Sequence, residues 1–342
     1  MTVKHTLKME LGDSGYNIYL GSDLLSSSDK FFDLDCRAAI VTDSGVPKAY
    51  SEAVAARCRE AKIITVPYGE ENKNIDTYSY ICKELLAFGL QRKDAVVAVG
   101  GGVVGDMAGF AAATYMRGVR FYNVPTTLLS QVDSSIGGKC AVDFLGVKNI
   151  LGAFYQPKAV LIDTDVLSTL DARQLSAGLA EVVKMSLTSD KDLFLDLEKG
   201  LWKKDLTNVI YRALMIKKNV VEQDERESSL RKILNFGHTL GHGIEALGGY
   251  LHGECVALGM LPMCSSEVAR KLIPILKDMK LPTDLSDIDP DAVIEYAKHD
   301  KKGNGDFCDA VFVDTPGSYR LESASFSELY ERLKNSMNSE AI

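Results

Sequence analysis

Three of the chain's five histidines, His238, His242 and His252, fall within fifteen residues of one another. His238 and His242 are four residues apart in a stretch with helical periodicity, so their side chains should share one helix face. Imidazole is the most common metal ligand among side chains, and a carboxylate or another histidine usually completes the set. The spacing favours His238 and His242 as metal ligands, although one capping and two packed histidines would give the same pattern.

Carboxylates in helical stretches are the candidates for a further ligand. Glu181 lies in the apolar stretch Ala180–Lys184, where a charge is either paired or functional. Glu245 and Glu254 are nearer to the histidines in sequence and compete for the same role. The spacing alone does not single out Glu181.

A charged run, Asp224–Glu227, precedes the histidines. Such a run is ordinarily a solvated face. Lys217 and Arg231 flank it, however, so one of its carboxylates could point inward.

A glycine-rich turn, Gly100–Asp106, directly follows the apolar run Ala95–Val99 and opens a helix. Glycine lets backbone N–H groups approach a diphosphate closely, and a helix N-terminus favours that negative charge. The turn is not the standard GxGxxG, and many tight turns bind nothing. Its place between a strand and a helix favours a nucleotide site without identifying the nucleotide.

A second polar segment, Asp133–Lys139, contains adjacent glycines and a lysine, and Lys148 and Asn149 follow it. We expect a loop here. Its lysines and glycines would suit a phosphate or a carboxylate, but an ordinary solvated loop has the same composition.

The elements that must position these residues differ between the two halves of the chain. The first half alternates short apolar runs with helical stretches, which predicts a parallel sheet with helices on both faces. The expected strands are Ala38–Thr42, Ile63–Val66 and Ala95–Val99, the expected helices are Lys48–Ala61 and Ile75–Gly89, and Leu7–Leu11 with Tyr16–Gly21 should form an edge hairpin.

Helical periodicity dominates after about Leu170, and we place a domain boundary near Asp165, giving domains 1–165 and 166–342. The expected helices are Ala177–Leu187, Leu193–Leu201, Leu206–Gln223, Leu230–Leu247, Gly253–Leu272 and Asp291–Ala297. One late strand, Ala310–Val313, should pair with Tyr319–Leu321 across a Pro-Gly turn.

The composition excludes several classes of protein. The chain is 46% hydrophobic and 25% charged, which is typical of a globular protein. A net charge of −8 argues against nucleic acid as the main partner. No apolar run approaches the roughly 20 residues of a membrane helix, and no secretory signal is apparent. The seven cysteines are odd in number and widely spaced, which favours reduced thiols and a cytoplasmic location.

A series of motifs between Asp43 and Lys302 resembles the 3-dehydroquinate synthase family. The motifs occur in the family's order and at its separations. They are Gly100–Asp106, Tyr115–Phe121, Val124–Leu129, Val132–Lys139, Gly146–Asn149, Gly178–Lys184, Asp224–Glu227, Asn235–His242 and His252–Glu254.

The resemblance implies an N-terminal Rossmann-like α/β domain that binds NAD, a C-terminal, mostly α-helical metal-binding domain, and a homodimer. It implies that Glu181, His238 and His252 hold zinc or cobalt, and that His242 is instead an acid/base or substrate contact. Other substrate-site matches are Arg117, Asp133, Lys139, Lys148, Asn149, Lys184, Lys217, Glu227, Arg231, Asn235 and one of Lys301 and Lys302. Arg117 matches a residue that reaches the substrate's phosphate from the partner subunit. Cofactor matches are Asp43, Glu70, Lys73, Gly101, Gly102, Val103, Gly105, Asp106, Thr126, Thr127, Lys139, Lys148 and Thr169.

The reaction that the resemblance implies converts 3-deoxy-D-arabino-heptulosonate 7-phosphate into 3-dehydroquinate and phosphate, within the shikimate pathway of aromatic amino acid biosynthesis. It combines oxidation by NAD, phosphate elimination, reduction, ring opening and an internal aldol closure. As a hypothesis, the substrate's own phosphate takes the proton during elimination, because the matched residues include no obvious dedicated base.

Three alternatives share parts of the pattern. Sister cyclases that make inosose or valiolone products share the metal and NAD motifs, but Arg231, Asn235 and the pair Lys148-Asn149 suit a substrate that carries a carboxylate. Metal-dependent alcohol dehydrogenases usually read GGGS where this chain has Val103. A non-enzymatic NAD- or metal-binding regulator would not need the full set of cationic residues.

Overall fold

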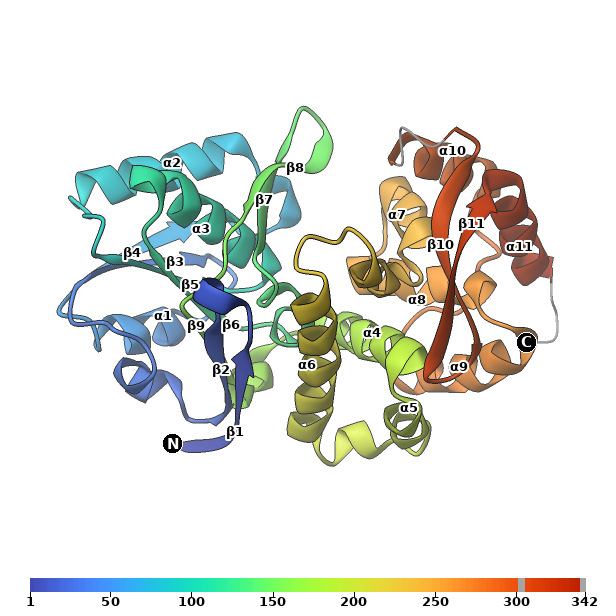
Figure 1. Cartoon of the computed structure of the whole chain (residues 1–342), viewed down its shortest axis with the longest axis horizontal. Coiled ribbons are helices and arrows are strands. Elements are labelled where there is room, and N and C mark those ends of the chain that lie inside the picture. The colour runs from blue at the N-terminus through green and yellow to red at the C-terminus, as the bar shows by residue number, and fades with distance from the viewer. Residues whose placement is uncertain (301–304, 339–342) are drawn as a thin grey trace. The chain divides into compact units, whose positions relative to one another are not determined.

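The parallel sheet predicted for the first half of the chain is present in the computed structural model, which describes residues 1–300 and 305–338. The chain divides into two compact units, Met1–Leu170 (unit 1) and Asp171–Ile342 (unit 2) (Figure 1). No helix among the described residues is long and apolar enough to cross a membrane.

The sheet of unit 1 has seven strands in the order β1-β2-β9-β6-β5-β3-β4. β1 and β2 pair antiparallel, as the edge hairpin predicted, and the other pairs are parallel. Their bounds are β1 Thr2–Met9, β2 Tyr16–Ser22, β3 Arg37–Asp43, β4 Glu60–Val66, β5 Ala95–Gly100, β6 Arg120–Pro125 and β9 Ala159–Asp163. Every residue of β5 is buried, as a continuous apolar run in a parallel sheet predicts.

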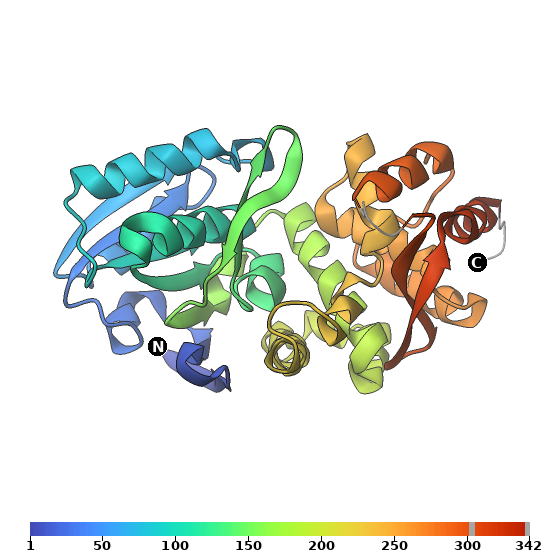
Figure 2. The same ribbon diagram turned by 45° about the horizontal axis from the view of Figure 1, so that its top comes forward.

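Helices cover both faces of this sheet (Figure 2). Val96 and Ala98 of β5 pack into a core cluster with α2 (Ile75–Ala87) and α3 (Gly102–Thr114). The alternate residues Ala95, Val97 and Val99 join a second cluster that includes Val54 of α1 (Lys48–Ala55). Successive side chains of a strand point to opposite faces, so the single run Ala95–Val99 supplies both cores.

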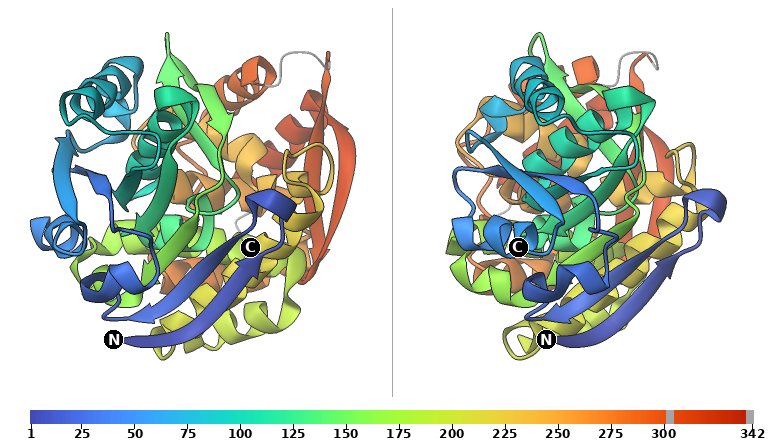
Figure 3. Two further views of the ribbon diagram at one scale, coloured as in Figure 1. Left: turned by 60° about the vertical axis from the view of Figure 1, so that its left-hand side comes forward. Right: turned by 90° about the vertical axis from the view of Figure 1, so that its left-hand side faces the viewer.

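Two predictions for unit 1 were wrong. The first helix was expected to reach Ala61, but it ends at Ala55, and Ala61 lies in β4 opposite Ala38 of β3. Sheet pairing overrides helical propensity there. The expected loop at Lys139 and Lys148 is a hairpin of β7 (Lys139–Phe144) and β8 (Val147–Phe154), which forms its own two-stranded sheet (Figure 3).

Unit 2 is mostly helical, and its described residues include one hairpin. Its helices are α4 Ala172–Ser189, α5 Lys191–Glu198, α6 Leu206–Gln223, α7 His238–Leu247, α8 His252–Met260, α9 Ser266–Asp278, α10 Pro290–Asp300 and α11 Phe326–Asn338. The predicted hairpin across the Pro-Gly turn is confirmed as β10 (Phe307–Thr315) and β11 (Ser318–Ser325).

Two predicted helices of unit 2 are interrupted. The stretch Leu230–Leu247 is a 3-10 helix, Leu230–Asn235, followed by α7, and the break contains Gly237 with a φ of 77°. The stretch Gly253–Leu272 is broken by a 3-10 turn, Leu261–Met263, which contains Pro262. Proline and left-handed glycine both disrupt helical hydrogen bonding, so periodicity alone joined segments that the backbone separates.

Candidate metal centre and nucleotide site

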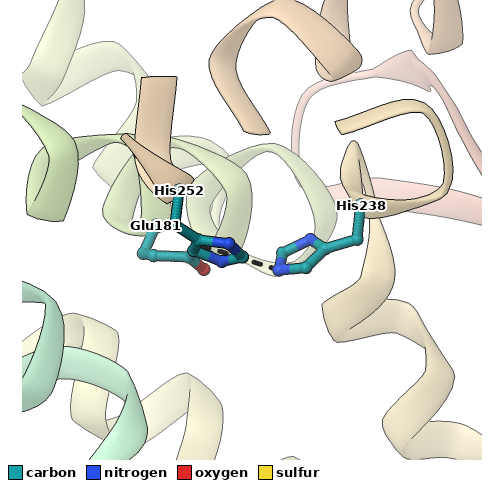
Figure 4. Close-up of side chains that lie close together, drawn as sticks. All are labelled: Glu181, His238 and His252. Carbon is teal, nitrogen blue, oxygen red and sulfur yellow. Dashed lines mark ion pairs between the residues drawn. The ribbon is translucent and has the colours of Figure 1, made fainter. Parts of the chain in front are cut away.

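Glu181, His238 and His252 converge in unit 2 from three different helices (Figure 4). Glu181 lies within α4, whereas His238 and His252 are the first residues of α7 and α8. Glu181 Oε1 is 3.7 Å from His238 Nε2 and 3.5 Å from His252 Nε2. One ligand atom from each of the three residues lies within 4.8 Å of the other two, which is the arrangement that a metal-binding triad requires.

Two glycines allow the three helices to approach so closely. A Cβ on Gly253 would lie 2.0 Å from the carbonyl oxygen of Ala177, so the start of α8 rests directly on α4. A Cβ on Gly237 would lie 2.8 Å from the carbonyl oxygen of Val256, and its φ of 77° favours glycine independently. Each glycine is adjacent to a histidine of the triad and brings its backbone toward the centre.

The charges around Glu181 suit a cation. The side chain is completely buried, and neither of its oxygens has a hydrogen-bond partner, although Lys184 Nζ forms an ion pair with Oε2. Burial by itself would raise the pKa of Glu181, but the charges of Lys184, His238 and His252 hold it well below its usual value. A buried carboxylate with unsatisfied oxygens that face two imidazoles fits a divalent metal such as zinc.

The pKa values of the two histidines shift in opposite directions. Burial, together with the nearby Lys184 charge, holds the pKa of His238 well below its usual value, so this ring is neutral and ready to bind a metal. Burial would also lower the pKa of His252, but the nearby carboxylates of Glu181 and Glu245 raise it to about 10. A metal that binds at His252 Nε2 must therefore displace a proton.

His242 lies beside the triad rather than in it. The centre of its ring is 5.3 Å from that of His238, and it forms a second possible ligand group with Glu245 and His252. The pair that spacing favoured, His238 and His242, is thus close in space, but the buried carboxylate Glu181 groups with His238 and His252.

The inward-pointing carboxylate of the charged run is Asp224, which residue types alone did not identify. Its two oxygens accept hydrogen bonds from the backbone N–H groups of Ser228 (2.8 Å), Ser229 (2.7 Å) and Arg231 (2.9 Å). Burial by itself would raise the pKa of Asp224, but these donors hold it well below its usual value. Asp224 thus fixes the loop that follows α6.

This loop gathers several predicted substrate-site residues. Asn235 Nδ2 donates to Glu227 Oε1 over 2.8 Å, and Glu227 holds a positive φ of 60°. The buried side chain of Arg231 donates to the carbonyl oxygen of Glu225 over 2.6 Å. Left-handed backbone in a non-glycine residue is costly and is common at functional sites. Asn149 and Arg117, two other predicted site residues, also have positive φ angles, of 53° and 65°.

The glycine-rich turn of unit 1 lies at a reversal of strand order. From β3 the chain adds β4 on one side and then β5 on the other, so β3 and β5 flank a topological switch point. Open parallel sheets bind nucleotides at the carboxyl ends of such strands. Gly100 ends β5, Gly101 caps α3, and a Cβ on Gly101 would lie 3.0 Å from the methyl group of Thr127. Gly101 and Gly102 thus add no side chain of their own at the N-terminus of this 13-residue helix.

Lys73 joins predicted cofactor residues to a predicted substrate residue. Its buried Nζ lies 2.6 Å from Asp106 Oδ2 and donates to Asn149 Oδ1 over 2.5 Å. Burial would lower the pKa of Lys73, but Asp106 and Glu70 raise it, so the lysine stays charged. Asp143 accepts from the backbone N–H of Asn149 over 2.7 Å and so fixes the start of β8 beside this lysine.

The remaining predicted residues occupy defined elements. Asp43 ends β3 and accepts from the backbone N–H of Gly45 over 2.7 Å. Asp133 lies in a π-helical turn, Ser130–Ser134, a rare conformation that is frequent at functional sites. The hydroxyl groups of Thr169 and Tyr50 are 2.9 Å apart. The predicted substrate contact at Lys301 or Lys302 lies outside the described residues.

Comparisons with known proteins agree over nearly the whole chain. Residues 63–177 match a family model described as 3-dehydroquinate synthase N-terminal, and residues 178–303 match one described as 3-dehydroquinate synthase C-terminal. The 3-dehydroquinate synthase of Clostridium acetobutylicum is 39% identical over 96% of this chain and 99% of its own length. That of Geotalea uraniireducens is 41% identical over 94% of this chain and 96% of its own length.

Solved structures of two cyclases are also similar. A 2-deoxy-scyllo-inosose synthase complexed with carbaglucose-6-phosphate, NAD+ and Co2+ is 28% identical, with a TM-score of 0.87 over 97% of this chain and 99% of that one. The 2-epi-5-epi-valiolone synthase of Streptomyces hygroscopicus, with NAD+ and Zn2+ bound, is 27% identical, with a TM-score of 0.85 over 94% of this chain and 96% of that one. A probable glycerol dehydrogenase from Sinorhizobium meliloti, 17% identical with a TM-score of 0.62 over 94% of this chain and 96% of that one, shares the fold alone.

Proposed function

We propose that this chain, which belongs to the 3-dehydroquinate synthase family, converts 3-deoxy-D-arabino-heptulosonate 7-phosphate into 3-dehydroquinate and phosphate. The observation that carries the proposal is the agreement of relatives about 40% identical, named 3-dehydroquinate synthase and aligned over most of the chain. This conversion is the step of the shikimate pathway that closes the carbocycle. We place it in the cytoplasm, which is in keeping with seven free cysteines.

The metal is the first cofactor of this proposal. Glu181, His238 and His252 would hold it, and the two unsatisfied oxygens of Glu181 support that role. A zinc or cobalt ion bound there would supply Lewis-acid chemistry, which acidifies a substrate hydroxyl and favours its oxidation. Lys184, which forms an ion pair with Glu181, is beside the same centre and would turn to an anionic group of the substrate.

NAD is the second cofactor. The backbone of Gly101, Gly102 and Val103 would bind its diphosphate at the start of α3, and Asp43 would accept hydrogen bonds from a ribose. NAD+ held there would supply a hydride acceptor that is regenerated within the reaction, so none would be consumed. Lys73 orients Asp106 on the cofactor side and Asn149 on the substrate side, which couples the two sites.

Cationic and polar side chains would hold the substrate's acidic groups. Lys217 and Arg231 are buried in unit 2. The low local dielectric there would strengthen their attraction to a substrate carboxylate. Asn235 and Glu227, in the loop that carries Arg231, form a hydrogen-bonded pair that can orient hydroxyl groups. His242, next to His238, is suited to take and return a proton at the reacting centre. We also propose a homodimer in which Arg117 serves the partner's site.

Sister cyclases are the second candidate, because the inosose synthase structure covers 97% of this chain. The two functions differ in the substrate's carboxylate. Arg231 is buried, its backbone N–H donates to Asp224 and its guanidinium donates to the carbonyl oxygen of Glu225. It is therefore pre-oriented for such a group, which favours the 3-dehydroquinate reaction.

The test measures phosphate release from 3-deoxy-D-arabino-heptulosonate 7-phosphate with catalytic NAD+ and zinc, while absorbance reports NADH. We expect release that needs both additives, with no net NADH, and a Glu181→Ala variant that releases none. Release only from a sugar phosphate that lacks a carboxylate would move the protein to the sister cyclases. Stoichiometric NADH would instead indicate a dehydrogenase.

A further inference from the structure

We propose that Glu245 is a positioning residue for the metal centre, which orients His252 by accepting a hydrogen bond at Nδ1 so that Nε2 faces the metal. The inference rests on the proposed metal centre and assigns a role to a carboxylate outside the triad. It concerns one contact: Glu245 Oε2 lies 3.2 Å from His252 Nδ1.

Glu245 reaches His252 because of its place on α7. It is seven residues after His238, which is about two turns of helix, so both side chains lie on the same face. His252 begins α8 and lies between them, with Nε2 3.5 Å from Glu181 Oε1 and Nδ1 toward Glu245. A single helix thus supplies one ligand and the group that holds another.

The contact between Glu245 and His252 determines which ring nitrogen of His252 carries the proton. A neutral ring has one N–H, and an acceptor at Nδ1 keeps the proton there and leaves the Nε2 lone pair for the metal. His238 has the equivalent arrangement with a neutral acceptor, because its Nδ1 is 3.1 Å from the carbonyl oxygen of Phe236. A carboxylate acceptor also makes the ring more basic and the metal bond stronger.

A second interpretation uses the same residues. His242, Glu245 and His252 could themselves hold an ion, with His252 bridging two metals through its two nitrogens. The hydrogen-bonding state of the carboxylates favours a positioning role. Both oxygens of the fully buried Glu181 lack a hydrogen-bond partner, whereas Glu245 is in contact with His252 Nδ1 and its side chain is 18% exposed. The number of metal ions per chain separates the two interpretations.

The experiment measures the dissociation constant of zinc by competition with a chelator, using metal-free full-length protein. Glu245→Gln keeps the shape and removes the charge, and it should weaken zinc binding about 10-fold, with Glu245→Ala approaching 100-fold. Glu222→Gln is the matched control, since Glu222 has the same 18% exposure and pairs with Lys218 instead of a histidine. Its dissociation constant should equal that of the wild type. Far-UV circular dichroism verifies that each variant is folded.

A double-mutant cycle tests whether Glu245 acts through His252. In a His252→Ala background, Glu245→Gln should cause no further change in zinc affinity. In the single Glu245→Gln variant, the visible spectrum of bound cobalt should shift. Wild-type zinc affinity in Glu245→Gln, or the same loss in both backgrounds, would overturn the inference. Two ions per wild-type chain would overturn it in favour of the bridged pair, and no zinc binding by the wild type would refute the proposed metal centre itself.

Discussion

Replacing Asp224 with asparagine should destabilise unit 2 by removing acceptors from a buried loop. The carboxylate accepts five hydrogen bonds, from the backbone N–H groups of Ser228, Ser229 and Arg231 and from the hydroxyl groups of Ser228 and Ser229. An amide offers one oxygen, so whichever way it turns its NH2 group faces at least one of these backbone N–H groups. If the nitrogen replaces Oδ2, the N–H groups of Ser229 and Arg231 are left unpaired.

The magnitude follows from the backbone N–H groups that lose their acceptor. A buried donor without an acceptor costs about 1–3 kcal/mol, so the loss of one or two acceptors gives about 2 kcal/mol. In a domain of this size each kcal/mol lowers the unfolding midpoint by roughly 2–4 °C, so we expect a drop of about 4–8 °C. Substrate KM should rise as well, because the loop carries Glu227, Arg231 and Asn235.

The pH dependence gives an independent readout of the same effect. The pKa of Asp224 in the folded chain is below its usual value, so its stabilisation is fully present above about pH 4. It is lost as the pH falls through the folded-state pKa. The difference in midpoint between wild type and Asp224→Asn should therefore be largest near neutral pH and shrink in acid.

Differential scanning calorimetry of metal-free protein measures these midpoints. Asp284→Asn is the control, because Asp284 is exposed and accepts from one backbone group, Ser286 N–H, over 2.9 Å. Its midpoint should stay close to that of the wild type. Equal midpoints for the Asp224 and Asp284 variants would refute the reasoning, as would a deficit in Asp224→Asn that does not change between pH 7 and pH 3.

Three further predictions concern the cofactor sites. Alanine at Glu181 should weaken zinc binding more than about 100-fold, and metal analysis after dialysis should find none bound; retained metal would contradict the assigned triad. The raised pKa of His252, about 10, means that zinc displaces a proton at neutral pH, so apparent affinity should rise about 10-fold per pH unit from pH 6 to 8. Calorimetry in buffers of different ionisation enthalpy counts that proton, and a buffer-independent heat would exclude its release. Lys73→Met should raise the dissociation constant of NAD+ about 10-fold, because Asp106 loses its buried partner, and a fluorescence titration that finds wild-type affinity would show that this pair does not organise the site.

Local sequence was sufficient to predict a strand, helix or turn where the residues that determine it lie within that element. The run Ala95–Val99 predicted a buried strand because every residue is apolar, and the next residues predicted a glycine-capped helix. The hairpin of β10 and β11 was readable from its turn. Helix ends were harder to predict. The end of α1 at Ala55 depends on the pairing of β4 with β3, which is a contact outside the helix.

The composition and motifs of the chain determined by themselves its α/β class, its family and the chemical kinds of residue available to it. Tertiary structure decided which of those residues meet. Spacing favoured His238 with His242, and only the resemblance pointed to Glu181, whereas the packing of α4 against α8 at Gly253 places Glu181 opposite His238 and His252. Periodicity describes one element at a time, and a metal centre assembled from three helices depends on how closely their backbones approach, which no single stretch of sequence specifies.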